Sequence, residues 1–480
     1  MASPVEQIIR GAVTRAVTKV AEFNRDRRKA DGPNPYLTGI HTPMTAETTL
    51  TDLKVTGSIP AELDGSYVRN GPNPVTPPNP ATHHWFVGTG MLHGVRLQAG
   101  RALWYRNRWI RGAEVSAALG EAPVPGPRAE GFDTPNTNVI GLAGATWAIV
   151  EAGGLPVRLD GELNTLAHDP FGGTLKHAFS AHPHVDPATG EQHAICYLGK
   201  VQDRVWHVVV TPQGRVRREE PIAVEHGPSI HDCMITPKYV IVLDLPVTFS
   251  MKTLLSGHPF PYRWNPAHRA RVGLLPREGK GSDIVWCDVD PCYVFHPANA
   301  YETDDGRVIF DACVHDTMFE GTYAGPSSNR VPFERWTIDP ATRTVARRVI
   351  DPSPQEFPRP NEALTGLPYR YAYTVALPEG GNPAFLDAPQ LYKHDLQAGT
   401  RQVHDFGTGQ VAGEFVFVPK AGATAEDDGW LMGYVIDKDR DTTDLVILDA
   451  SDMAAPPVAA IHIPHRIPPG FHGNWLPDPA

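Results

Sequence analysis

Cysteine is scarce in this chain. Its 480 residues include five cysteines, and no two of them form a C-x-x-C pair. An odd number of cysteines without a secretory signal is typical of free, buried thiols in a reducing compartment. We therefore expect a cytoplasmic protein with neither a disulfide framework nor a cysteine metal site. The five residues are Cys196, Cys233, Cys287, Cys292 and Cys313.

Long apolar runs and an excess of positive charge are also missing. No stretch approaches the roughly 18 to 20 apolar residues that a membrane-spanning helix needs, so we expect no segment to cross a membrane. The net charge is −11 and the body of the chain has no basic stripe, which argues against nucleic acid as a partner. No G-x-G-x-x-G lies between a strand and a helix, so neither a dinucleotide nor a flavin site is indicated.

Residues 1–32 differ in pattern from the rest of the chain. Ile9, Val13, Val17 and Val20 recur at helical spacing among many basic residues. This predicts an amphipathic N-terminal helical segment that could make peripheral contact with an anionic membrane surface. The alternative is that the helix frays or docks on its own domain, which the general behaviour of chain ends favours.

From residue 33 to residue 480, short apolar runs alternate with polar turns. The chain contains 48 prolines and 44 glycines, and strand-like runs such as residues 307–313 and 444–449 flank the turns. We predict a single all-β domain whose hairpins form the blades of a β-propeller, with two packed sandwiches as the alternative. No repeat signature recurs that would give the number of blades.

Histidine is plentiful, with 21 residues, and four of them lie in unusual settings. His182 and His296 precede a proline, His231 precedes an aspartate, and His472 lies in a Gly-Phe-His-Gly-Asn-Trp run. Successive members are 49, 65 and 176 residues apart, which suits ligands that reach one axis from different blades. Four neutral imidazoles suit iron, copper, nickel or zinc. His184 would share a strand face with His182 and is its rival as the first ligand.

Around these histidines the chain resembles the carotenoid cleavage oxygenase family, from about residue 33 to residue 476. The matching motifs are Ala-His-Pro with Asp-Pro-Ala-Thr-Gly-Glu, then His-Asp, Phe-His-Pro-Ala-Asn-Ala-Tyr-Glu and Pro-Gly-Phe-His-Gly-Asn-Trp. The resemblance implies a seven-bladed propeller with a cap of loops and helices over an axial metal site. It assigns Fe(II) as the cofactor and His182, His231, His296 and His472 as its ligands. A basic residue is usual in the family at the position of His184, which favours His182.

The resemblance also assigns three carboxylates beside the metal-bound histidines. They are Glu151, Glu362 and Glu414, each within a matching motif. Such carboxylates accept a hydrogen bond from the ring nitrogen that does not bind metal, and thereby orient the ring. Thr134 matches a residue whose side chain can crowd an open position on the iron, with a turn hydrogen bond as its alternative role. Thr89 stands where many relatives carry an acidic residue.

By this resemblance, the chain is a dioxygenase that uses O₂ to cleave an alkene into two carbonyl products. The substrate would be small, apolar and conjugated, with carotenoids and apocarotenoids ahead of isoeugenol, 4-vinylguaiacol and stilbenes. Lignostilbene-cleaving relatives hold the substrate phenol with a lysine where this chain has Val150. An isomerase of the same family and a metal-free binding scaffold are further hypotheses. Aromatic candidates for the pocket lining are Phe260, Tyr262, Trp264, Phe295 and Phe471, although aromatic residues in such runs more often belong to the core.

Overall fold

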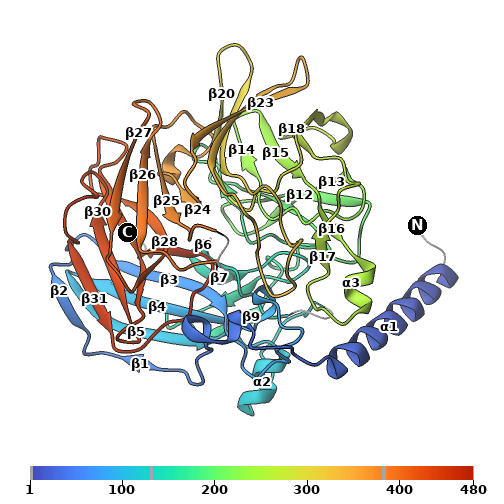
Figure 1. Ribbon diagram of the computed structural model, residues 1–480, viewed down its shortest axis with the longest axis horizontal. Coiled ribbons are helices and arrows are strands. Elements are labelled where there is room, and N and C mark those ends of the chain that lie inside the picture. The colour runs from blue at the N-terminus through green and yellow to red at the C-terminus, as the bar shows by residue number, and fades with distance from the viewer. Residues whose placement is uncertain (1–3, 130–132, 381–384, 479–480) are drawn as a thin grey trace.

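Strands make up most of the regular structure. The structure is a computed structural model that describes residues 4–129, 133–380 and 385–478, with side chains from residue 16 onward. Helices are few among these residues: α1 (Pro4–Arg27), α2 (Ala113–Leu119) and α3 (Met251–Leu255). α1 extends along the outside of the molecule and contacts α3 (Figure 1).

Within the described residues, the strands form a propeller of seven antiparallel blades. Blade 1 contains β6 (Asn138–Leu142), β7 (Ala145–Ile149), β8 (Val157–Leu159) and β9 (Thr165–His168). Blade 2 contains β10 (His184–Val185), β11 (Gln192–Cys196), β12 (Arg204–Val210) and β13 (Val216–Ala223). Blade 3 contains β14 (Met234–Ile235), β15 (Tyr239–Asp244), β18 (Arg271–Pro276) and β19 (Val285–Asp288). The hairpin of β16 (Val247–Phe249) and β17 (Tyr262–Trp264) is inserted within it.

The remaining blades continue in chain order. Blade 4 contains β20 (Pro297–Glu302), β21 (Val308–Cys313), β22 (Phe333–Asp339) and β23 (Thr344–Asp351). Blade 5 contains β24 (Gln355–Arg359), β25 (Tyr371–Ala376), β26 (Gln390–Asp395) and β27 (Thr400–Asp405). Blade 6 contains β28 (Gln410–Pro419), β29 (Gly429–Asp437), β30 (Thr442–Asp449), β31 (Ala459–Ile463) and β2 (Lys54–Gly57). Blade 7 contains β32 (Gly473–Pro477), β3 (Gly65–Pro72), β4 (Gly90–Gln98), β5 (Arg101–Trp109) and β1 (Thr49–Leu50).

The two ends of the chain close the ring together. In blade 7, β32 from the C-terminal end pairs with β3 from the N-terminal end, so that Ser66 faces Leu476 and Arg69 faces Gly473. In blade 6, β2 pairs with β31. Because β32 is the innermost strand of blade 7, this pairing fixes the position of His472, the residue that precedes it.

Burial decreases from the middle of a blade to its rim. In blade 4, every residue of β21 is buried, whereas the outermost strand β23 has only its last residue buried. A strand in the middle of a blade packs against neighbouring blades on both faces, so both of its faces favour apolar side chains. The outermost strand borders solvent and accepts charged residues.

The structure confirms the all-β propeller and not the pair of sandwiches. Residues 308–313 and 444–449 lie in β21 and β30, and all five cysteines are buried and free. The N-terminal segment is helical as expected, with Val17 half-buried and Val20 47% exposed, while the side chains of Ile9 and Val13 lie outside the described residues. The domain boundary at residue 32 stays a prediction. Among the described residues, none of the helices has the length and hydropathy to span a bilayer.

Candidate metal centre

Four histidines occupy equivalent places in four blades. His182, His231, His296 and His472 each lie one to three residues before the innermost strand of a blade, namely β10, β14, β20 and β32. Inner strands of a propeller converge on its axis, so residues that enter them from the same end meet there. The ring therefore gathers side chains from blades 2, 3, 4 and 7, although they are distant in sequence.

The four imidazoles point their nitrogen atoms at one another. His182 Nε2 lies 3.0 Å from His231 Nε2, which lies 3.2 Å from His296 Nε2. One nitrogen from each of the four histidines, His472 included, lies within 4.8 Å of the others, and all four side chains are buried. Two nitrogens at right angles and about 2.1 Å from one ion would be about 3.0 Å apart, so the cluster fits a single transition-metal ion.

Two of the rings are oriented by buried carboxylates. His296 Nδ1 donates to Glu356 Oε2 at 2.6 Å, and His472 Nδ1 donates to Glu414 Oε1 at 3.0 Å. Each carboxylate is nearly or fully buried. A hydrogen bond at Nδ1 leaves Nε2 unprotonated and free to bind a metal, which is the arrangement usual at protein metal sites.

The rings of His231 and His182 also have carboxylate neighbours, but these contacts are poorly aligned or longer. His231 Nδ1 lies 2.8 Å from Glu151 Oε2, out of line for a hydrogen bond. His182 Nδ1 lies 3.6 Å from Asp232 Oδ2, whose other oxygen is 2.7 Å from His184 Nε2. His184 therefore binds Asp232 and does not enter the four-histidine cluster, which agrees with the choice of His182 over His184.

The electrostatic environment keeps the cluster suited to a cation. Burial lowers the pKa of His182 well below its usual range, and the neighbouring histidines lower it further. Burial also lowers the pKa of His472, and Glu414 offsets only part of this effect. Burial alone would raise the pKa of Glu414, but its interactions with His472 and Arg359 outweigh this effect and lower that pKa to about 2. Glu414 is thus ionised, and the rings of His182 and His472 are neutral at neutral pH.

The prediction for Glu362 is wrong. Its side chain is 59% exposed and pairs with Arg359 at 2.6 Å, and the carboxylate that binds His296 is Glu356. Asn361 caps a 3-10 turn that begins at Glu362, which places this glutamate at the start of a turn and not inside a strand. The sequence signal that could have found Glu356 is its position directly before the Phe-Pro-Arg-Pro-Asn segment that also contains Arg359.

Irregular strands aim the functional side chains at the axis. In β24 the register with β25 shifts between Glu356 and Arg359, and Phe357 has a positive φ of 53°. Similar shifts occur in β20, just after His296, and in β28, around Glu414. A bulge rotates the following side chains relative to the regular pleat, and such irregularities are frequent near active sites. A sequence pattern of period two does not reveal them.

A second buried histidine also binds Glu356. His315 Nε2 lies 2.8 Å from Glu356 Oε1, and both side chains are fully buried. The sequence analysis missed His315, because nothing in its local Val-His-Asp setting distinguishes it from an ordinary core histidine. His315 therefore contacts one carboxylate oxygen of Glu356, and His296 contacts the other.

An aromatic cavity of about 570 Å³ opens on one side of the histidines. His231, His296 and His472 form part of its wall, together with Thr134 and Val150. Thr89 also lines it and bonds to the backbone of Asn73. Of the predicted aromatic residues, Trp264 packs in the core instead. Those that line the cavity are Phe260, Tyr262, Phe295 and Phe471.

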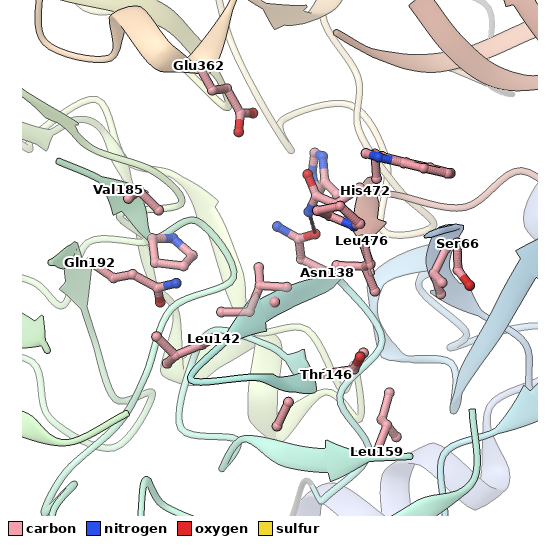
Figure 2. A pocket seen from close by; sticks show the side chains of 18 of the residues that line it. Ser66, Asn138, Leu142, Thr146, Leu159, Val185, Gln192, Glu362, His472 and Leu476 are labelled. Atoms are coloured by element: carbon pink, nitrogen blue, oxygen red, sulfur yellow. Dashed lines mark hydrogen bonds between the residues drawn. The ribbon is translucent and has the colours of Figure 1, made fainter. Parts of the chain in front are cut away.

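A larger and more polar cavity of about 1140 Å³ is lined by His182, His296 and His472. It runs between the inner strands, and Figure 2 shows His472 beside Asn138 of β6 and Leu476 of β32 on its wall. Glu362 also lines this cavity, apart from His472. The histidine cluster therefore borders both this larger, more polar cavity and the aromatic cavity.

Comparison with known proteins agrees with this geometry. Residues 41–477 match the RPE65 family, described as retinal pigment epithelial membrane protein. The chain is 43% identical to a carotenoid cleavage oxygenase of Mycobacterium tuberculosis, with 93% of this chain and 98% of the relative covered. The chain belongs to the RPE65/carotenoid cleavage oxygenase family. It is therefore an oxidoreductase of a class that incorporates O₂ into its substrates.

Solved structures of this family share the fold. The apocarotenoid oxygenase of Synechocystis superposes with a TM-score of 0.82 at 28% identity, covering 94% of this chain and 100% of the other. The lignostilbene dioxygenase of Pseudomonas brassicacearum superposes with a TM-score of 0.83 at 27% identity and the same coverage. The carotenoid cleavage oxygenase fold thus accompanies both carotenoid and stilbene chemistry in these similar proteins.

Proposed function

We propose that the protein is a non-haem Fe(II) dioxygenase that cleaves a carbon-carbon double bond of a carotenoid or apocarotenoid into two carbonyl products. The observation that carries this proposal is the buried four-histidine cluster in the wall of an aromatic cavity. A neutral ligand set leaves the ion's full charge available, and the cavity suits an apolar conjugated substrate.

The four histidines would hold the iron, which supplies the site with its capacity to activate O₂. Glu356 and Glu414 orient two of the rings through Nδ1, and we assign Glu151 the same task for His231. Thr134 is buried in the cavity wall, where we expect it to restrict access to the open side of the ion. These residues position the site and take no proton from the substrate.

Aromatic side chains in the cavity wall beside the histidines would hold the alkene and exclude water. The ring of Phe295 lies 5.0 Å from that of His231, and the ring of Phe357 lies 5.1 Å from that of His296. Flat aromatic walls bind a planar conjugated chain through its faces. Because such walls make few polar contacts, shape decides which double bond lies nearest the histidines.

Phenylpropanoid alkenes are the second candidate substrate class. The similarity to a lignostilbene dioxygenase structure favours them, whereas Val150 in the cavity wall offers no polar anchor for a phenol. An isomerase of the same fold would use the same cavity without consuming O₂.

The exposed apolar residues of α1 suggest where a lipophilic substrate is collected. Val20 is 47% exposed and Phe23 is 53% exposed, among basic residues of the same helix. Such a helix binds the surface of an anionic membrane. We propose a cytoplasmic protein that makes peripheral membrane contact through α1.

The decisive experiment is product analysis under labelled oxygen. Iron-loaded protein is incubated under ¹⁸O₂ with a panel of carotenes, apocarotenals, isoeugenol, 4-vinylguaiacol and stilbenes, and the products are identified by mass. We expect labelled carbonyl products from the polyenes. Cleavage without label in either carbonyl would refute the dioxygenase, and a product isomeric with the substrate would indicate an isomerase.

A further inference from the structure

The C-terminal turn of α1 is seated in a fitted site on the body of the protein. Asn24 Nδ2 donates to Leu255 O at 2.6 Å, and Arg28 Nη1 donates to Ser256 O at 2.9 Å. Gly257, with φ of 93°, allows the helix to come close: a Cβ there would lie 2.6 Å from the backbone nitrogen of Arg25. Only glycine fits at this contact, so the loop after α3 is shaped to the end of α1.

A second loop holds the same turn from another side. Asn79 Nδ2 donates to Arg25 O at 2.8 Å and to Arg28 O at 3.1 Å. Arg25 lies in the last turn of α1 and Arg28 directly follows the helix, a region where backbone acceptors commonly lack donors from the helix itself. Asn79 and Arg25 both line the aromatic cavity. The end of α1 is therefore part of the cavity wall.

The cavity changes in character with distance from the histidines. Its metal end is walled by Phe295, Phe357 and Phe471, which contact the histidine rings or precede one of them. Its outer end, where α1 lies on the outside of the molecule, is lined by Arg25 and His83 (Figure 1). A ligand that fills it therefore meets apolar walls at one end and hydrogen-bonding groups at the other.

Arg25 has unused capacity to donate hydrogen bonds. Among the described residues that line the cavity, it is the one arginine or lysine, and its side chain makes a long 3.4 Å hydrogen bond from Nε to Gly257 O. Nearby carboxylates have other partners, since Asp133 pairs with Arg128 and Glu114 accepts from Thr76. The guanidinium offers five donors in a planar fork, a geometry that suits an oxygen acceptor of a ligand.

We propose that the C-terminal turn of α1 closes the outer end of the substrate cavity and that the Arg25 guanidinium binds an oxygen atom at the outer end of the substrate. This inference rests on the proposed function, because it takes the aromatic cavity to be the substrate site. The proposal restricts the substrate class to conjugated chains with a carbonyl, hydroxyl or carboxylate terminus. It also fixes the direction of entry, with the apolar end toward the histidines and the oxygen toward α1.

Binding without turnover tests the proposal. Iron-loaded, full-length protein is kept free of O₂, and the dissociation constants of all-trans-retinoic acid and of axerophtene, its hydrocarbon analogue, are measured by quenching of tryptophan fluorescence. Trp85 lines the cavity and reports its occupancy. We expect Arg25→Met to weaken the acid about 10-fold, as loss of a charge-assisted hydrogen bond would, and axerophtene less than about 2-fold.

Arg28→Met is the matched control. Arg28 lies on the same turn and binds Ser256, but it does not line the cavity, so we expect both ligands to bind as they do to the unmodified protein. Equal weakening of both ligands by Arg25→Met, an unchanged affinity for the acid, or the same effect from Arg28→Met would overturn the proposal. Because no cleavage is measured, a failure of the proposed dioxygenase activity would be seen separately, in the ¹⁸O₂ experiment.

Discussion

Glu356 and Glu362 stand close together in sequence and have different surroundings. Glu356 is fully buried between His296 and His315, whereas Glu362 is exposed at the start of a 3-10 turn. Burial raises the pKa of Glu356 in itself, but the charge and hydrogen bond of His296 and His315 outweigh it and lower that pKa well below its usual range. The buried glutamate therefore carries a charge that stabilises a cationic site.

Replacement of this charge tests the assignment directly. We expect Glu356→Gln to weaken metal binding by about 10- to 100-fold, as loss of such an outer carboxylate does, because the amide orients His296 less strongly. Competition with a coloured chelator measures the dissociation constant. Glu362→Gln is the control and should leave it within about 2-fold. If the two variants bind metal equally well, Glu356 does not support the site.

Metal removal tests whether the histidines share one ion. A ligand that binds only the folded state stabilises it by about 2.7 kcal/mol at a concentration 100 times its dissociation constant. We expect Fe(II) to raise the melting temperature of the chelator-treated protein, as followed by circular dichroism. His296→Ala should abolish this rise and His226→Ala, at an exposed histidine outside the cluster, should not. A rise that survives His296→Ala would contradict a shared site.

At the scale of elements, β32 is the strand that closes the ring of blades and positions part of the histidine cluster. β32 lies between the axis and β3, and the backbones of the two strands approach closely at Gly65, where a Cβ would lie 2.4 Å from Leu476 O. The contact is with backbone, which cannot move aside without shifting the strand. Since His472 precedes β32, this pairing also sets one member of the histidine cluster.

An alanine at this position should therefore disturb both stability and metal binding. We expect Gly65→Ala to lower the free energy of unfolding by about 1–3 kcal/mol, the usual cost of overpacking, and to weaken metal binding through His472. Urea denaturation and chelator competition measure the two effects. Gly161→Ala is the control, because a Cβ there meets nothing within 4 Å. Equal stability of the two variants would show that β32 tolerates displacement.

At the scale of the whole molecule, buried neutral histidines are numerous outside the metal site. Burial lowers the pKa of His83, His193 and His394 to about 4 in each case. In the unfolded chain, the same side chains have a pKa of about 6.5. Between these two values the unfolded state binds more protons than the folded state, so acid favours unfolding.

We therefore expect the free energy of unfolding to fall as the pH is lowered from 6.5 to 4. Each such histidine contributes a slope that approaches about 1.4 kcal/mol per pH unit within this window. Urea denaturation at intervals of pH measures the total slope. His193→Asn should reduce this total slope by the contribution of one histidine. A free energy that stays constant from pH 7 to pH 5 would show that these histidines titrate normally in the folded protein.

The sequence alone was enough to predict the all-β class of structure and to select four histidines as candidate metal ligands. Short strands between Gly- and Pro-rich turns sufficed for an all-β fold, because alternation and turn chemistry are local properties. The motifs around His182, His231, His296 and His472 distinguished them from the other histidines of the chain, including His184. Only the tertiary structure decided which glutamate supports His296, since the register shift in β24 turns Glu356 toward the axis. It also decided that the end of α1 borders the aromatic cavity, because that contact depends on loops distant in sequence, and no local pattern encodes such a contact.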